Sequence, residues 1–329
     1  MNRINLLPLL LLALVVVCQS QTRTTKDVGE VAYPYELHQM DFISQRQELQ
    51  MTYMYEKAKE GNGKTVLLLH GKNFSGLYWG KVMDKLMSKG YNVIAPDQVG
   101  FGSSSMPANY EYSFQQLAMN TAKLLDTLKI KKVIVLGHSM GGMLATRFAL
   151  LFPERTEQLI LENPIGLEDW KLLVPYTTID QEYKKELGKT HESVKKYMVE
   201  NYFHNEWKND YDFLLAEFDQ SIATAEYKEQ AWNMALTSDM IFTQPVCYEF
   251  AKLQVPTVLI IGQKDRTAIG KDKVSKEKAA EMGNYSALGK LTASKISNCM
   301  LVEMPDAGHI PHVEQFDLFM VNLSNVMVK

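Results

Sequence analysis

Short apolar runs alternate with longer amphipathic stretches over most of the chain. Each apolar run is expected to form a strand: residues 65–69, 91–95, 132–136, 158–162, 256–261 and 300–304. Helices are expected over four stretches: residues 76–89, 113–128, 140–151 and about 313–328. Because strands that are apolar on both faces must be covered on both, this alternation predicts a parallel sheet with helices on its two sides.

Two regions depart from this alternation. Residues 35–57 contain two stretches of alternating apolar and polar positions, which are typical of an antiparallel pair of strands. Residues 165–246 are rich in Tyr, Trp, Glu and Lys at helical spacing and contain no convincing strand. We therefore expect an α/β fold, a mostly parallel central sheet flanked by helices, built from residues 21–164 and 247–329. Residues 165–246 are expected to form a helical cap inserted between these two parts.

The first 20 residues have the pattern of a signal peptide. Arg3 gives a positively charged start, residues 6–17 are almost entirely apolar, and Cys18-Gln19-Ser20 provides small residues for cleavage after Ser20. The apolar run is shorter than the roughly 20 residues that span a membrane. We therefore expect export to the periplasm or the extracellular space, without stable membrane insertion after signal removal. The alternative is a lipoprotein acylated at Cys18, which the bulky Val17 before the cysteine disfavours.

Composition limits the classes of protein. The chain has 329 residues, of which 46% are hydrophobic and 22% are charged, as in an ordinary globular protein. The net charge is −3 and no dense cluster of Lys and Arg is present, so nucleic acid is not expected as a partner. Cys247 and Cys299 are expected to be free and buried, although the sequence does not decide whether they pair. The sequence gives no indication of the oligomeric state.

The strongest chemical signal is the segment Gly137-His138-Ser139-Met140-Gly141-Gly142. It follows an expected strand and begins an expected helix, which is the context of a nucleophile elbow, a tight turn that exposes a serine above the sheet. Side chains at Gly137 or Gly141 would clash with the neighbouring strand or helix. The backbone N–H of Met140 is expected to point towards an oxyanion that forms on the substrate. The strand and the helix on either side disfavour the alternative, a glycine-rich turn that only packs.

A serine hydroxyl needs a base nearby to act as a nucleophile. His309 lies in a loop directly after the last expected strand, and Asp265 lies at the end of the strand before it. The order Ser, Asp, His along the chain fits a catalytic triad, and the carboxyl ends of parallel strands meet at one edge of a sheet. We therefore predict Ser139 as the nucleophile, His309 as the base and Asp265 as the acid that orients the histidine.

The chain resembles the α/β-hydrolase family from about Tyr35 to the end. Besides the serine elbow and the acid and histidine loops, the resemblance rests on two segments after strands: His70-Gly71 and Asp97-Gln98-Val99-Gly100-Phe101-Gly102-Ser103-Ser104. It implies a mechanism in which the serine attacks a carbonyl, the histidine transfers its proton, and water then releases the acid from an acyl-enzyme.

The resemblance also implies the second oxyanion donor. By position, this donor is the backbone N–H of Lys72, with Asn73 as the alternative, and the side chain of Lys72 is expected to be incidental. His70 is expected to brace this loop, Asp97 to shape the loop beside the site, and His138 to be packed.

The remaining polar and aromatic residues are expected to be structural. His309 and His312 are three positions apart, but no zinc-binding pattern accompanies them. We therefore expect neither a metal nor a cofactor. Most aromatic residues of the cap are expected to form its core: Trp170, Tyr176, Tyr202, Trp207 and Trp232. The sequence does not tell which of them line a pocket.

The residue at the elbow narrows the reaction class. Family members that hydrolyse epoxides or remove halides use an aspartate there, so Ser139 favours acyl transfer to water, with carboxylic esters as the first expectation. Amide or peptide bonds, C–C bonds of diketone-type compounds and cofactor-free perhydrolysis are the alternatives within the fold. A binding protein without activity is the alternative outside it, and the presence of all three triad residues disfavours it. A cap over the site predicts a small to medium, largely apolar substrate, whose identity the sequence leaves open.

Overall fold

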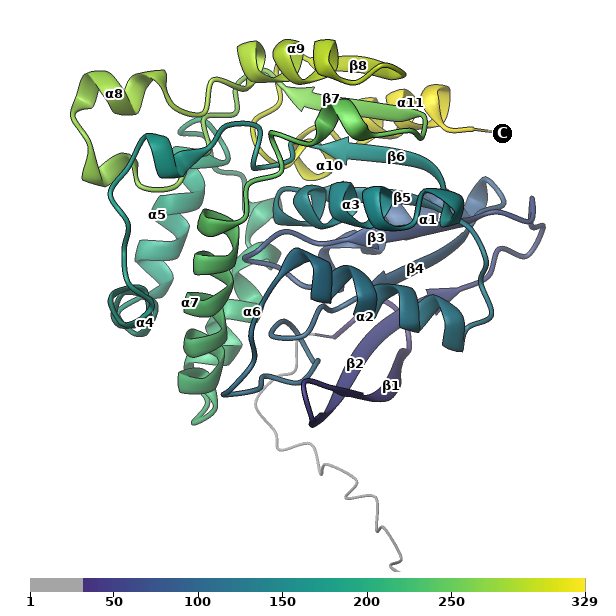
Figure 1. Cartoon of the computed structure of the whole chain (residues 1–329), viewed down its shortest axis with the longest axis horizontal. Helices are drawn as coiled ribbons and strands as arrows, with labels where there is room; N and C mark the ends of the chain where they lie inside the picture. The colour runs from purple at the N-terminus through teal and green to yellow at the C-terminus, as the bar shows by residue number, and fades with distance from the viewer. Residues whose placement is uncertain (1–31, 329) are drawn as a thin grey trace, which may run out of the picture. The chain divides into compact units, whose positions relative to one another are not determined.

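One sheet of eight strands forms the centre of residues 32–328, the part of the chain that the computed structural model describes (Figure 1). The strands are β1 (Leu37–Ser44), β2 (Gln47–Glu56), β3 (Thr65–Leu69), β4 (Asn92–Pro96), β5 (Val133–His138), β6 (Thr156–Glu162), β7 (Thr257–Gly262) and β8 (Cys299–Met304). Their order across the sheet is β1-β2-β4-β3-β5-β6-β7-β8. β2 is antiparallel to both of its neighbours, and all pairs from β4 to β8 are parallel. The prediction of a mostly parallel sheet is therefore confirmed, whereas the predicted signal peptide lies outside the described residues.

Helices cover both faces of the sheet because its inner strands are apolar on both faces. In β3, Leu67 and Leu69 pack in one cluster with α2 (Phe114–Thr127) and α3 (Met140–Leu151). Val66 and Leu68 alternate with them and pack on the opposite face with α1 (Gly80–Ser88) and α11 (Phe316–Val326). All five residues of β3 are buried. This burial on two sides explains why the strand is a continuous apolar run in the sequence.

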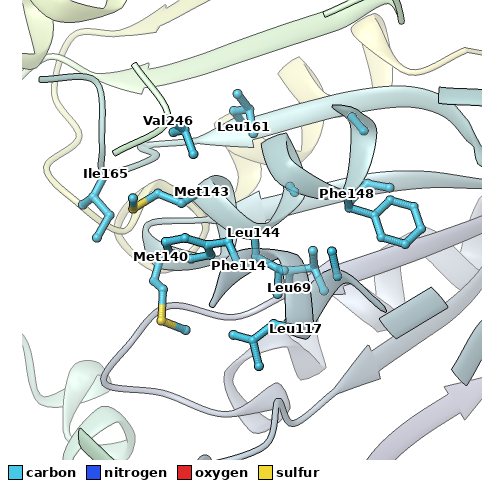
Figure 2. Close-up of a cluster of buried hydrophobic side chains, with 14 of the residues drawn as sticks. Leu69, Phe114, Leu117, Met140, Met143, Leu144, Phe148, Leu161, Ile165 and Val246 are labelled. Atoms are coloured by element: carbon cyan, nitrogen blue, oxygen red, sulfur yellow. The ribbon is translucent and has the colours of Figure 1, made fainter. Parts of the chain in front are cut away.

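Figure 2 shows the first of these clusters around the start of α3. The labelled side chains come from α2, α3, β3 and β6, and also from Ile165 and Val246, at the two ends of the predicted cap. Met140 and Met143, on the first turn of α3, are fully buried in this cluster. The helix that follows Ser139 is therefore anchored by apolar contacts from the sheet and from both ends of the segment 165–246.

Between β6 and β7, the described chain forms helices and no strand. The longer helices of this region are α4 (Ile179–Leu187), α5 (His191–Asn201), α6 (Phe213–Ile222) and α7 (Tyr227–Thr243). Figure 1 shows them gathered on one side of the sheet, on the left of the view. Capping boxes formed by Thr178 with Gln181 and by Thr190 with Ser193 begin α4 and α5. We call residues 165–246 the cap segment.

The structure differs from the predicted helices at three places. The stretch 76–89 is a short 3₁₀ turn, Gly76–Trp79, followed by α1. The predicted closing helix is divided into α10 (Pro311–Glu314) and α11, because Gln315 has a non-helical backbone. Between β7 and β8, α8 (Lys276–Glu281) and α9 (Tyr285–Lys295) were not predicted. A glycine in α9, Gly289, packs against Ile261 of β7, and glycine lowers helix propensity, which hides this helix in the sequence.

Cys247 and Cys299 are both free thiols. Cys247 is buried, as expected, but Cys299 is only half-buried because it begins β8, a strand at the edge of the sheet. No helix within residues 32–328 is long and apolar enough to cross a membrane.

Candidate active site

Ser139 lies at the turn between β5 and α3 with an unusual backbone conformation. Its φ is 55° and its ψ is −119°, which is strained for any residue other than glycine. Two glycines make the turn possible. A Cβ on Gly137 would lie 2.1 Å from the carbonyl oxygen of Gly141, and a Cβ on Gly141 would lie 2.1 Å from that of Leu69. The predicted steric reason for both glycines therefore agrees with the geometry.

Backbone hydrogen bonds hold the strained serine in place. The N–H of Ser139 donates to the carbonyl oxygen of Glu162, at the end of β6, at 3.2 Å. The carbonyl oxygen of Ser139 accepts from the N–H groups of Gly142 at 2.9 Å and Ile165 at 3.2 Å. The turn at Ser139 is therefore bonded to the neighbouring strand and to the first residue of the cap segment.

The structure brings Ser139, His309 and Asp265 together in the order that the sequence predicts. Nε2 of His309 is 2.9 Å from Oγ of Ser139, and Nδ1 of His309 is 2.7 Å from Oδ2 of Asp265. The histidine and the aspartate are fully buried, and 6% of Ser139 is exposed. Because a carboxylate only accepts, Nδ1 carries the proton and Nε2 presents its lone pair to the serine hydroxyl. This arrangement is able to remove a proton from Ser139.

Asp265 has a buried partner that sequence reasoning missed. Nδ2 of Asn163 donates to Oδ2 of Asp265 at 2.8 Å, and the N–H of Thr267 donates to Oδ1 at 2.7 Å. Asn163 also accepts from the N–H of Gly262 at 2.9 Å and has a φ of 38°. Its place directly after a predicted strand, at the same sheet edge as the triad, was the available signal. Asn163 therefore orients the carboxylate that orients His309.

The loop of His309 is held by three consecutive backbone N–H groups. Those of Gly308 and Ile310 donate to the carboxylate of Glu314, at 2.9 to 3.1 Å, and that of His309 donates to the carbonyl oxygen of Tyr202 at 2.9 Å. The Tyr202 ring also stacks on the His309 ring, with centroids 4.6 Å apart. Tyr202 ends α5, so an aromatic residue of the cap segment contacts the predicted base directly.

Glu314, which holds this loop, makes the stability of the protein depend on pH. Burial raises the pKa of Glu314 to about 7, although the hydrogen bonds from Gly308 and Ile310 lower it. As the pH rises, Glu314 loses its proton near pH 4.5 in the unfolded chain but only near pH 7 in the folded protein. The contribution of Glu314 to the free energy of unfolding therefore falls as the pH rises from 4.5 to about 7.

We expect Glu314→Gln to remove this dependence. The stability of the wild type relative to the variant should fall as the pH rises from 4.5 to 7, by about 3 kcal/mol at most. Urea unfolding at several pH values measures this difference, and Glu60→Gln, at an exposed position, is the control. A stability difference that stays the same at every pH would contradict the prediction.

The two predicted oxyanion donors belong to segments next to the serine. Met140 directly follows it, and Lys72 belongs to the loop after β3, which we call the oxyanion loop (residues 70–75). A Cβ on Gly71 would lie 3.2 Å from the Cβ of Ser139, so this loop lies against Ser139. Within the described chain, the N–H groups of Lys72 and Met140 donate to no backbone carbonyl. Both groups are therefore available for an oxyanion.

Three side chains of the oxyanion loop each bind a different helix of the cap segment. The contacts are Lys72 Nζ to Glu186 Oε1 of α4 at 3.2 Å, Asn73 Nδ2 to Tyr202 Oη at the end of α5 at 2.7 Å, and Ser75 Oγ to Glu217 Oε1 of α6 at 2.5 Å. The expectation that the Lys72 side chain is incidental was therefore wrong, because it forms a largely buried ion pair.

The two carboxylates in these contacts respond to their surroundings in opposite ways. Burial by itself raises the pKa of Glu186, but the positive charges of Lys72 and Lys189 lower it to about 2. Burial raises the pKa of Glu217 to about 7, since only the hydrogen bonds with Ser75 act in the other direction. The contact to α4 is thus an ion pair, whereas in the contact to α6 the carboxyl group of Glu217 changes its charge near neutral pH.

The other polar residues lie where the sequence analysis expected structural roles. Asp97 accepts from the N–H groups of Gly76 at 2.7 Å and Ser103 at 2.9 Å, and so shapes the loop after β4. His312 is paired with Glu162 and not with His309. Within residues 32–328, no group of three or more His, Cys, Asp or Glu side chains is arranged to hold a metal ion.

Comparisons with known proteins give the family. A family model for the alpha/beta hydrolase fold matches residues 64–316. The crystal structure of a probable hydrolytic enzyme from Pseudomonas aeruginosa PAO1 matches 90% of this chain and 96% of that chain, with 47% sequence identity and a TM-score of 0.88. The chain belongs to the α/β-hydrolase fold family.

Three further relatives show how far sequence similarity extends. Lipase 3 from Moraxella sp. is 26% identical over 79% of this chain and 76% of the lipase. The 2-hydroxy-6-oxo-2,4-heptadienoate hydrolase from Pseudomonas putida is 36% identical over 32% of this chain and 40% of that hydrolase. An uncharacterized protein from Mycobacterium tuberculosis is 38% identical over 32% of this chain and 31% of its own length. The match to the mycobacterial relative thus covers only about a third of that protein's length.

Proposed function

We propose that the protein is an exported serine hydrolase that cleaves a carboxylic ester, or a related acyl bond, of a small to medium and largely apolar substrate. The observation that carries this proposal is the buried array in which His309 contacts both the Ser139 hydroxyl and the Asp265 carboxylate, at 2.9 and 2.7 Å. Such an array converts a serine hydroxyl into a nucleophile at neutral pH. The similarity to Lipase 3 over 79% of this chain supports an ester as the substrate.

The positions of the protons define the steps. Oγ of Ser139 bonds to the carbonyl carbon while its proton passes to Nε2 of His309, and the carbonyl oxygen becomes an oxyanion beside the N–H groups of Lys72 and Met140. The bond to the alcohol oxygen then breaks, and the alcohol leaves with the proton from His309. Water attacks the acyl-serine in the same way, releases the carboxylic acid and restores the hydroxyl of Ser139. The carboxylate of Asp265 stabilises the positive charge that the histidine carries during these steps.

A second candidate is the hydrolysis of a C–C bond by the same array. The relative from Pseudomonas putida is named as a 2-hydroxy-6-oxo-2,4-heptadienoate hydrolase, and its 36% identity favours this candidate. The match covers 40% of that hydrolase. A substrate panel therefore has to compare esters, amides and diketone-type compounds directly.

Labelling with a fluorophosphonate probe tests the nucleophile. We expect the purified wild type to be labelled and Ser139→Ala to be unlabelled, because the probe reacts with an activated serine. Ser324→Ala, on α11, is the matched control and should be labelled like the wild type. A panel of p-nitrophenyl esters, aminoacyl amides and diketone-type compounds then sorts the substrate class. If the folded wild type stays unlabelled and inactive, the hydrolase proposal fails and a binding protein becomes the better interpretation.

Export is tested separately, because residues 1–20 lie outside the described chain. N-terminal sequencing of the protein recovered from the periplasm or the medium should give Gln21 as the first residue. Recovery from membranes with a lipid on Cys18 would favour the lipoprotein alternative. An uncleaved chain in the cytoplasm would contradict export.

A further inference from the structure

Gly71 is fixed by hydrogen bonds to both of its backbone polar groups, although it lies outside any helix or strand. Its N–H donates to Oη of Tyr78 at 3.0 Å, and its carbonyl oxygen is 2.9 Å from Nδ1 of His70. Gly71 directly precedes Lys72 and lies against Ser139. The groups that hold Gly71 therefore determine where the proposed oxyanion donor of Lys72 lies.

Further hydrogen bonds extend from His70 and from Tyr78, in opposite directions. Nε2 of His70 accepts from the N–H of Gln98 at 3.0 Å. On the other side, Oη of Tyr78 is 2.9 Å from Nδ1 of His138, whose Nε2 is 2.8 Å from the carbonyl oxygen of His309. His70 and His138 are fully buried, and Tyr78 is 4% exposed. One buried chain of hydrogen bonds thus leads from the loop after β4, through the oxyanion loop, to the loop of the base.

The two ends of this chain fix which nitrogen carries a proton in His70 and that Nε2 carries one in His138. The N–H of Gln98 only donates, so Nε2 of His70 has no proton and Nδ1–H donates to the carbonyl of Gly71. The carbonyl of His309 only accepts, so Nε2 of His138 carries a proton. His138 is fully buried, and burial disfavours a charged imidazole. Its Nδ1 therefore carries no proton and accepts from the hydroxyl of Tyr78, which itself accepts from the N–H of Gly71. The two histidines are then neutral and in opposite tautomers.

We infer that His70, Tyr78 and His138 are positioning residues that hold the oxyanion loop in a fixed position relative to the loop of His309. This inference rests on the proposed function, because the two loops need this fixed position only if Ser139 is acylated. Tyr78 is the central link, since its hydroxyl accepts from one loop and donates towards the other. Loss of this hydroxyl leaves the triad intact, but the N–H of Gly71 loses its acceptor and Nδ1 of His138 loses its donor.

The electrostatic surroundings agree with two neutral histidines. Burial lowers the pKa of His70, against the attraction of the Asp97 charge, which raises it. Burial also lowers the pKa of His138 well below its ordinary value, and the neighbouring His309 and His312 lower it further.

NMR of protein labelled with ¹⁵N at its histidine side chains tests the chain without using activity. At pH 7, we expect His70 as the neutral Nδ1–H tautomer and His138 as the neutral Nε2–H tautomer, with signals assigned through His70→Gln and His138→Gln. The opposite tautomer or an imidazolium at either residue would overturn the inference. This result does not depend on whether the protein is a hydrolase.

Kinetics of Tyr78→Phe test the positioning role. Loss of one oxyanion donor lowers kcat by about 10²- to 10³-fold, and a displaced donor should have part of this effect. We therefore expect kcat for a p-nitrophenyl ester to fall about tenfold or more, with KM within about threefold and binding of a boronic acid weakened in parallel with kcat/KM. Tyr110→Phe is the matched control, because it removes a buried hydroxyl with two partners, Ser44 and Asn120, and should change kcat by less than about twofold.

The outcomes separate the two proposals. An active wild type whose kcat is unaffected by Tyr78→Phe would overturn the positioning role alone. A wild type that is neither labelled nor active would overturn the proposed function, while the NMR experiment would still show whether the chain of hydrogen bonds exists.

Discussion

Asp265→Asn is expected to lower kcat by about 10³- to 10⁴-fold while the protein stays folded. Oδ1 of Asp265 accepts from Thr267, and Oδ2 accepts from both Asn163 and His309. An amide has one oxygen for these three donors, so its NH₂ group must face at least one of them. If the NH₂ group takes the place of Oδ2, Nδ1 of His309 has to accept, and the proton moves to Nε2. The histidine would then present a proton, and not a lone pair, to Ser139.

The measurement is steady-state kinetics on the best ester of the panel, together with thermal unfolding. Asp306→Asn is the matched control, because this aspartate lies in the same loop as His309 but its side chain is 73% exposed and pairs with Lys264 at 3.3 Å. The control should keep kcat within about twofold, because exposed ion pairs contribute little. Equal losses in both variants would contradict the assigned role of Asp265.

Gly141→Ala is expected to destabilise the protein by more than about 3 kcal/mol or to prevent folding. The new Cβ would lie 2.1 Å from the carbonyl oxygen of Leu69 and 2.7 Å from that of His70. Both obstacles are backbone atoms at the end of β3, which cannot rotate away as a side chain does. Relief requires that α3 move away from the sheet, and this movement would also displace Ser139.

Urea unfolding and fluorophosphonate labelling measure the two consequences. Gly188→Ala, at the end of α4, is the matched control: the nearest atoms to its Cβ would be 3.5 and 3.6 Å away, which is ordinary contact. The control should change the stability by less than about 1 kcal/mol and keep the labelling. A stable, labelled Gly141→Ala protein would show that the elbow is less tightly packed than this geometry indicates.

The sheet was predictable from sequence because a strand that is buried on both faces is a continuous run of apolar residues. β3 is one continuous apolar run, and its predicted bounds match the structure. The elements that were not predicted lack such a clear sequence pattern. Gly289 weakens the helical pattern of α9, and the break at Gln315 between α10 and α11 depends on backbone angles that residue types do not specify.

The site was predictable for the residues that strand ends bring together, and not for those that reach it from elsewhere. Ser139, Asp265 and His309 each follow a parallel strand, so topology places them at one edge. Tyr202 approaches His309 from the cap segment, and Glu186 reaches Lys72 across more than a hundred residues of chain. Such contacts depend on how helices of the cap segment pack, which periodicity does not encode.

The contacts of the oxyanion loop with α4, α5 and α6 have a consequence for evolution and for engineering. The cap segment is not an exchangeable module, because Glu186, Tyr202 and Glu217 each provide the partner of one loop residue. A cap transplanted from a relative would leave Lys72, Asn73 and Ser75 facing unmatched side chains unless residues 72–75 were transferred with it. Changes that alter substrate choice through these helices should therefore be inherited together with changes in a four-residue stretch of the core.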